Sequence, residues 1–200
     1  MSGRFLLLTP DRTDPKFSHA IFHFEDGNRL VFQDQRHFGY MNIVRTENLG
    51  ETKEISKLAP EPLSEDFTET YLWKVFRKKR NIKAILLDQS RVCGLGNIYA
   101  SEALFRAGIH PAAATTRITK ARTGKLFDSI RDTLGDAIEA GSTLNVDPEN
   151  IDGGYDGGNF ESRWCVYDRE GENCFVCGSQ ILRLKQGTRS SYFCPTCQRR

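Results

Sequence analysis

The sequence predicts an α+β protein built from three parts of different character. Residues 1–57 alternate apolar and polar side chains in short runs, which is typical of β-strands, whereas residues 58–143 repeat apolar side chains at helical spacing. Residues 165–200 hold two pairs of cysteines around a short alternating segment, which predicts a β-hairpin beside a metal. A 200-residue chain that is 38% hydrophobic and 27% charged is neither collagen-like nor wholly disordered.

The N-terminal part is predicted to form a small sheet. The run Ala20–Phe24 alternates, Glu25–Asn28 contains an Asp-Gly step that favours a tight turn, and Arg29–Phe32 returns, so these residues predict a hairpin. A further strand is predicted over Phe38–Val44. About four strands in residues 1–57 are too few to close a barrel or to cover both faces of a sandwich. We therefore expect an uncovered apolar face.

The first predicted helix follows Pro60 and Pro62. Ser64 is the expected N-cap, and the two acidic residues after it suit the positive end of the helix dipole. A second, short helix is predicted over residues 83–89. The apolar stripe of the first helix consists of Phe67, Tyr71, Leu72, Val75 and Phe76.

Two longer helices complete the middle part. The third begins after a Gly-Leu-Gly-Asn turn and ends before Gly108, and the fourth spans about 119–140, with Gly141 as its stop. The segment that follows is rich in glycine and acidic residues and shows little periodicity. We expect a flexible loop over residues 144–164.

Charge is unevenly distributed along the chain. The net charge is only +2, but seven basic residues and one acidic residue lie between Tyr71 and Arg91. Such a basic zone suits a polyanion, although a solvated helix face would read the same way. Between Asp136 and Glu161 there are seven acidic residues and no basic one.

Four of the six cysteines predict a zinc site. Cys174, Cys177, Cys194 and Cys197 form two C-x2-C pairs separated by sixteen residues, a spacing that closes a tetrahedral, structural site for one Zn²⁺ ion. The alternative is a pair of disulfides in a secreted protein, but we expect no export signal. Cys93 and Cys165 have no such pattern and are expected to be buried as small apolar side chains.

The turn Gly94–Asn97 is a candidate phosphate site. Glycines let the backbone approach a phosphate closely, and the helix after them offers free amides. The Asn97 side chain can also donate to a phosphate oxygen. A dinucleotide-binding loop would need a strand before the glycines, where a helix is predicted. A tight helix–helix turn without a ligand remains the alternative.

These motifs together resemble the formamidopyrimidine-DNA glycosylase/endonuclease VIII family. The resemblance implies the remainder of an N-terminal β-sandwich catalytic domain over 1–57, a helix–two-turns–helix domain over 58–143, a base-recognition loop over 144–164 and a zinc finger over 165–200. The segments that carry it are 34–39, with Gln35 and His37 as departures, 59–63, 87–89, 94–111, 166–171, the four cysteines and 198–200.

The resemblance implies a base-excision-repair DNA glycosylase and AP lyase that excises oxidised purines and cleaves at abasic sites. Family members begin with Pro-Glu, and the terminal proline amine attacks the sugar. Because this chain begins Met-Ser-Gly, we expect it to be catalytically incomplete and to form no Schiff base with DNA. The alternative is a non-catalytic, zinc-containing module that binds damaged DNA. A ribosomal or transcription zinc ribbon would explain the cysteines but not the helical signature.

Roles of individual residues follow from their positions in the family's motifs. Met1, Arg36 and Phe38 resemble the wedge that fills the stack when a damaged nucleotide is flipped out, although Phe38 in a strand core is the alternative. Lys79 and Asn97 resemble phosphate contacts. The remaining candidates are Lys83, as a neighbouring DNA contact on the solvated surface, and Arg189, as a phosphate contact with a catalytic role in the elimination step.

The expected partner is damaged double-stranded DNA. We expect a monomer in the cytoplasm, associated with the nucleoid. No apolar run approaches the roughly 18 residues that a transmembrane helix needs, so no membrane association is expected.

Overall fold

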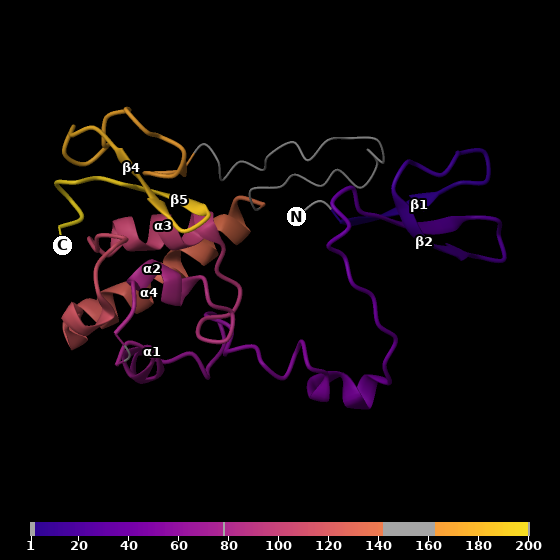
Figure 1. Ribbon diagram of the computed structural model, residues 1–200, viewed down its shortest axis with the longest axis horizontal. Coiled ribbons are helices and arrows are strands. Elements are labelled where there is room, and N and C mark those ends of the chain that lie inside the picture. Colours follow the sequence, from indigo (N-terminus) through magenta and orange to yellow (C-terminus); the bar gives the residue numbers. More distant parts are fainter. Residues whose placement is uncertain (1–2, 78, 142–162, 200) are drawn as a thin grey trace. The chain divides into compact units, whose positions relative to one another are not determined.

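A computed structural model describes residues 3–77, 79–141 and 163–199 (Figure 1). The chain divides into two compact units, one ending at Leu49 and the other beginning at Gly50. The loop predicted over 144–164 lies outside the described residues, apart from its last two positions.

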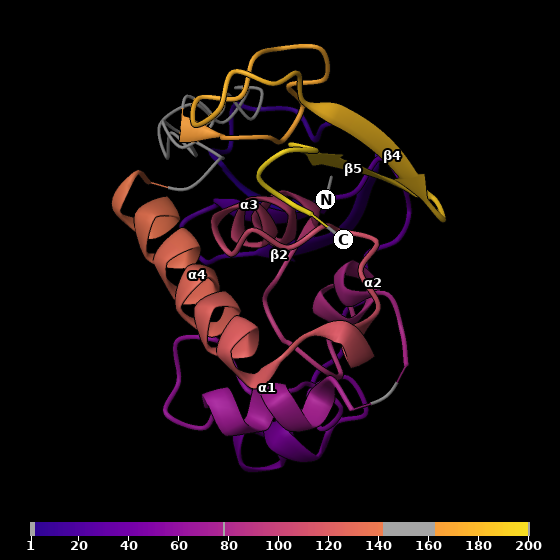
Figure 2. The ribbon, with the colours of Figure 1, turned by 90° about the vertical axis from the view of Figure 1, so that its left-hand side faces the viewer.

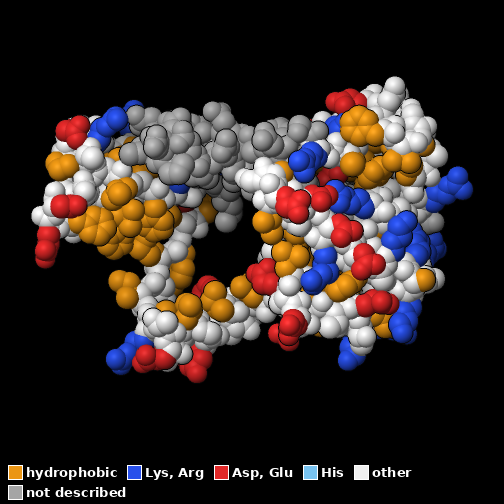
Figure 3. Space-filling model, turned by 180° about the vertical axis from the view of Figure 1, so that it is seen from behind, with side chains coloured by type: hydrophobic (Ala, Val, Ile, Leu, Met, Phe, Trp, Pro, Cys, Tyr) orange, Lys and Arg blue, Asp and Glu red, His pale blue; other side chains and the backbone are white. Residues whose placement is uncertain are grey.

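The first unit is a three-stranded antiparallel sheet. Strands β1 (Arg4–Leu8), β2 (Ser18–His23) and β3 (Arg29–Gln33) are ordered β1-β3-β2, which confirms the predicted hairpin. One face buries a small core, and the other leaves apolar side chains exposed, as Figure 3 shows for this unit. The buried residues are Leu6, Leu8 and Val31, and the exposed ones include Phe5, Leu7 and Phe22.

The strand predicted over Phe38–Val44 is wrong, and so is the expected strand count. The described part of residues 1–57 contains three strands and a 3₁₀ helix, η1 (Thr46–Glu51). The reason lies in Asp34, a buried carboxylate that accepts hydrogen bonds from the backbone N–H groups of Arg36 (3.2 Å) and Gly39 (2.6 Å). The backbone is thereby turned into a loop at the point where a strand would have to begin.

The described part of the second unit contains four α-helices. These are α1 (Glu69–Val75), α2 (Ile82–Leu86), α3 (Asn97–Arg106) and α4 (Lys120–Glu139), with a 3₁₀ turn, η2 (Thr115–Arg117), before α4. Helix α3 lies at the centre and contacts α2, α4 and the C-terminal strand β5 (Arg189–Phe193) (Figure 2). One continuous cluster of buried side chains joins the helices, including Phe67, Leu72, Phe76, Ile85, Leu104, Leu126 and Ile130.

Capping residues explain where the helices begin and end. Thr68, rather than the predicted Ser64, caps α1, because its hydroxyl accepts from the Tyr71 N–H at 3.1 Å. Helix α4 matches the prediction at both ends, since Thr119 caps it and Gly141 follows with a φ of 75°. Helix α2 begins earlier than predicted, because Asn81 Oδ1 accepts from two backbone N–H groups of its first turn, and it also ends earlier, at Leu86.

The C-terminal segment folds onto α3. Strands β4 (Leu182–Gln186) and β5 pair in antiparallel register, which confirms the predicted hairpin. Phe105 of α3 belongs to the same buried cluster as Val166, Ile181 and Tyr192, so the hairpin and the helical domain share apolar contacts. Among the described residues, we find no helix long and apolar enough to cross a membrane.

Candidate zinc centre and nucleic-acid interface

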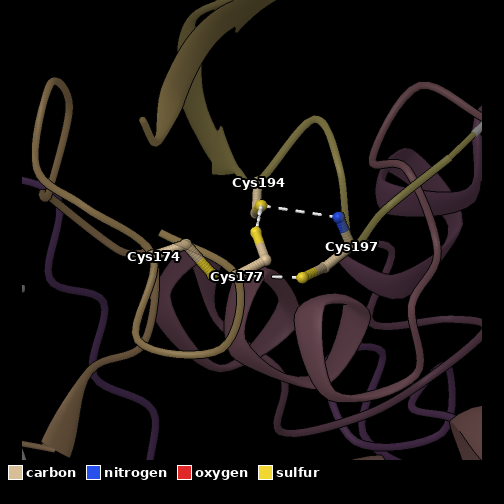
Figure 4. A group of neighbouring side chains, drawn as sticks. All are labelled: Cys174, Cys177, Cys194 and Cys197. Carbon is tan, nitrogen blue, oxygen red and sulfur yellow. Dashed lines mark hydrogen bonds between the residues drawn. The ribbon is translucent and has the colours of Figure 1, made fainter. Parts of the chain in front are cut away.

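The four predicted zinc ligands come together in space. The Sγ atoms of Cys174, Cys177, Cys194 and Cys197 all lie within 4.8 Å of one another (Figure 4). The Cys177–Cys194 pair is separated by 3.4 Å and the Cys174–Cys197 pair by 4.0 Å. Thiolates about 2.3 Å from a tetrahedral zinc lie about 3.8 Å apart, a value between these two distances.

The disulfide alternative does not fit. All six cysteines are free, and sulfur atoms in a disulfide lie about 2.05 Å apart, far closer than any pair here. Hydrogen bonds from the side chain and backbone of Ser179 lower the pKa of the Cys177 thiol to about 6. This favours the thiolate that zinc requires at Cys177, whereas burial raises the pKa of the Cys194 and Cys197 thiols. The donor set therefore fits one structural Zn²⁺ with no open position for a water.

A buried carboxylate seats the zinc-binding segment on α3. Glu102, which is 1% exposed, accepts backbone hydrogen bonds from Cys165 (2.8 Å), Val166 (3.0 Å) and Tyr167 (2.8 Å). Charge-assisted bonds of this kind are the strong ones. Sequence reasoning missed Glu102, whose signal is an acidic residue among the apolar positions Ala100, Ala103 and Leu104 of a helix.

The glycine turn before α3 has the geometry that a phosphate site needs. Gly94 has a φ of 75°, a backbone conformation that side chains other than glycine's rarely adopt. A Cβ atom at this position would also lie only 2.9 Å from Glu61 Oε2, so both the backbone and the available space favour glycine. Gln89 holds the turn by accepting from Gly94 N–H and donating to the Leu95 carbonyl. Gly96 is the N-cap of α3 and provides no side-chain cap, so the positive end of the helix dipole is not closed by a side chain of the N-cap residue.

Asn97 links this turn to the zinc hairpin. Its Nδ2 donates to the Ser190 carbonyl at 3.1 Å, and that residue directly follows Arg189 on β5. A phosphate would therefore have to compete with Ser190 for the Asn97 amide. The Asn97 Oδ1 atom is buried and has no partner among the described residues. The side-chain role predicted for Asn97 thus remains a prediction.

Lys83 requires a correction, because it is not on the solvated surface. Its side chain is only 2% exposed, and Nζ donates to Ser101 Oγ, the Ser190 carbonyl and Ser191 Oγ. Lys83 is one of the buried residues of α2, together with Ile82, Ile85 and Leu86. A group that buried does not reach a phosphate, so we reassign Lys83 from DNA contact to structural support of β5.

The other predicted DNA contacts that the structure describes are divided between the two units. Lys79 and Arg189 are exposed in the second unit. The positive charge of Arg189 also lowers the pKa of Lys83. In the first unit the Arg36 guanidinium lies 5.6 Å from the centre of the Phe38 ring. Phe38 is 76% exposed, so the alternative of a strand-core position is wrong. Met1 lies outside the described residues.

We name Asn97, Arg189 and the first turn of α3 the phosphate clamp. An exposed guanidinium, the amino end of a helix and the Asn97 amide that holds the Ser190 carbonyl lie together where β5 meets α3. Such groups bind an anionic oxygen without reading a base. The geometry thus fits the sugar–phosphate backbone of a nucleic acid.

Three family models match successive parts of the chain. A model described as the formamidopyrimidine-DNA glycosylase H2TH domain matches residues 58–147. The N-terminal domain model of the same glycosylase matches residues 1–41, and a zinc finger found in FPG and IleRS matches residues 171–200.

Individual relatives are similar in sequence to nearly the whole of this chain. A formamidopyrimidine-DNA glycosylase of Pelotomaculum thermopropionicum is 42% identical, with 100% of this chain and 72% of that relative covered. A Roseobacter denitrificans relative of the same name is 43% identical, with 92% of this chain and 65% of that relative covered. Among solved structures, Lactococcus lactis Fpg bound to DNA containing an abasic site matches with a TM-score of 0.87 and 33% identity, over 100% of this chain and 73% of that one.

Proposed function

The chain belongs to the formamidopyrimidine-DNA glycosylase family, and from this premise we propose that it is a base-excision-repair DNA glycosylase and AP lyase acting on damaged duplex DNA. The observation that carries the proposal is the junction between α3 and β5. There the Asn97 amide and the Ser190 carbonyl, next to Arg189, are fixed to each other at 3.1 Å. The zinc ion fits this function as a structural element that keeps β5 in place.

The proposed division of labour separates positioning from chemistry. The phosphate clamp and Lys79 hold the DNA backbone, whereas Arg36 and Phe38 are wedge residues that occupy the stack when the damaged nucleotide leaves it. Arg189 also serves the elimination step. Its positively charged guanidinium group can stabilise the departing phosphate, but a guanidinium is a poor nucleophile or base. We propose that the protein acts as a monomer associated with the nucleoid.

The direct test compares damaged with undamaged DNA. We expect the zinc-loaded protein to bind a duplex with an abasic-site analogue roughly tenfold or more tightly than the intact duplex, because flipping costs least at a damaged position. Fluorescence anisotropy at fixed salt measures both affinities, and a gel assay on DNA carrying 8-oxoguanine or an abasic site measures cleavage. Equal affinities would contradict the proposal. Preferential binding with or without cleavage would support recognition of damage, and cleavage would contradict the expectation of a catalytically incomplete chain.

Lys79→Ala should weaken binding to all DNA sequences alike. Lys79 is exposed in the basic zone, and a phosphate contact carries no base information. Losing one such contact should flatten the slope of log Kobs against log[salt] by about one unit. The measurement is a salt titration of Kd. Lys120→Ala, which removes an exposed charge at the start of α4, is the matched control. Unchanged affinity and slope in Lys79→Ala would show that this contact is misplaced.

A further inference from the structure

The buried amino group of Lys83 joins three elements. Its Nζ lies 2.9 Å from Ser101 Oγ on α3, 3.1 Å from the Ser190 carbonyl and 2.8 Å from Ser191 Oγ on β5, while Lys83 itself belongs to α2. The Ser190 carbonyl also accepts from Asn97 Nδ2. One backbone oxygen beneath the phosphate clamp is therefore held by Lys83 and Asn97 together.

Counting hydrogens shows which form of Lys83 fits this site. The Ser101 hydroxyl donates to the Asn97 carbonyl, and the Ser191 hydroxyl donates to Gln186 Oε1, so both hydroxyl hydrogens are already used. The third partner is a carbonyl, which can only accept. Nζ must therefore donate three hydrogen bonds, and only the ammonium form carries three hydrogens. A neutral amine would turn a lone pair toward one of the acceptors.

Two effects oppose that charge. Burial lowers the pKa of Lys83 from its ordinary value to about 7, and the nearby Arg189 guanidinium acts in the same direction. The three acceptors therefore favour the ammonium form, whereas burial and the charge of Arg189 make it less stable than the ammonium of an exposed lysine. A group balanced in this way responds to any new charge placed beside it.

We propose, on the basis of the proposed function, that Lys83 is a positioning residue whose ammonium group fastens β5 beneath the phosphate clamp, and that DNA binding at the clamp is coupled to uptake of a proton by Lys83. A phosphate beside Arg189 offsets the guanidinium charge that disfavours the ammonium. It also adds a negative charge of its own. Both effects favour the protonated form, so by linkage protonation favours DNA binding.

The other groups around Lys83 leave Arg189 as the relevant charge. The side chains that α3 and β5 turn toward it are hydroxyl or amide groups. Arg183 on β4 donates to the Ser190 hydroxyl and lies 3.6 Å from Glu170, with which it forms an exposed ion pair. The Tyr167 hydroxyl lies 3.5 Å from Asn97 Nδ2.

The test measures proton uptake and affinity together. For the zinc-loaded protein and a duplex with an abasic-site analogue, Kd should rise about tenfold between pH 6 and pH 8.5 at constant salt. Calorimetry near pH 7 in buffers of different ionisation enthalpy should show net proton uptake. Lys83→Met keeps the length of the side chain but can neither donate nor titrate, and it should bind weakly with no uptake from this site. Lys185→Met removes an exposed charge from β4 and should keep the wild-type pH profile.

The outcomes separate this inference from the function on which it rests. The same pH profile and the same uptake in wild type and Lys83→Met would overturn the role of Lys83 while leaving DNA binding intact, because groups other than Lys83 would then account for the protons. No DNA binding at any pH would overturn both. Should Lys83→Met fail to fold, NMR of the lysine ε-methylene groups decides: one lysine must titrate near pH 7 in the free protein and higher in the complex.

Discussion

Replacing Cys194 with alanine is expected to abolish stoichiometric zinc binding and to unfold the C-terminal hairpin. Cys194 is fully buried, its Sγ lies 3.4 Å from that of Cys177, and it also accepts from the Cys197 N–H. Binding of structural zinc supplies on the order of 10 kcal/mol in zinc-finger peptides, and a segment this small has little other core to replace it. The helical core should stay folded, because its buried cluster is separate. Elemental analysis and circular dichroism measure the two effects.

DNA affinity should also decrease when the C-terminal hairpin unfolds. Arg189 and Ser190 lie on β5, so loss of the metal removes one side of the phosphate clamp, and we expect affinity to drop about tenfold or more. Cys165→Ala is the matched control, since Cys165 lies outside the four-sulfur cluster, and it should keep one zinc per chain. Less than about half a mole of zinc per mole of wild-type protein, or an intact hairpin after chelation, would contradict the prediction.

Local signals account for what the sequence predicted well. The hairpin of β2 and β3 follows from alternation around an Asp-Gly step, and α4 follows from an apolar stripe between Thr119 and Gly141. The zinc ligands were predictable because C-x2-C spacing by itself fixes a turn with two converging thiols. Each of these features depends on residues that are close together in the sequence.

The wrong predictions concern residues whose position depends on contacts or strand pairing with residues far away in the sequence. Lys83 reads as one more residue of a basic run, but its acceptors Ser190 and Ser191 lie more than a hundred positions away. Phe38–Val44 has the composition of a strand, yet a strand requires a neighbour to pair with, and Asp34 bends the backbone first. Such pairings depend on tertiary structure, which local patterns do not contain.

Glu102→Ala is expected to destabilise the protein by about 3–5 kcal/mol. The buried carboxylate satisfies three backbone N–H groups over residues 165–167, and removing it leaves each of them without this acceptor at a buried or partly buried position. Glu102→Gln should cost less, about 2 kcal/mol, because the amide oxygen can still accept while its NH₂ group faces a donor. Chemical denaturation measures both values.

Hydrogen exchange separates this local role from general destabilisation. The amides of Cys165, Val166 and Tyr167 should exchange faster in Glu102→Gln, whereas amides within α4 should change little, because Glu102 holds the start of the zinc-binding segment and not the helical core. Glu139→Gln removes an exposed charge at the end of α4 and should stay within about 0.5 kcal/mol of wild type. Equal effects of the two Gln substitutions would mean that the buried carboxylate does not seat the zinc segment. A selective loss of protection at residues 165–167, accompanied by weaker DNA binding, would link this carboxylate to the clamp through β5.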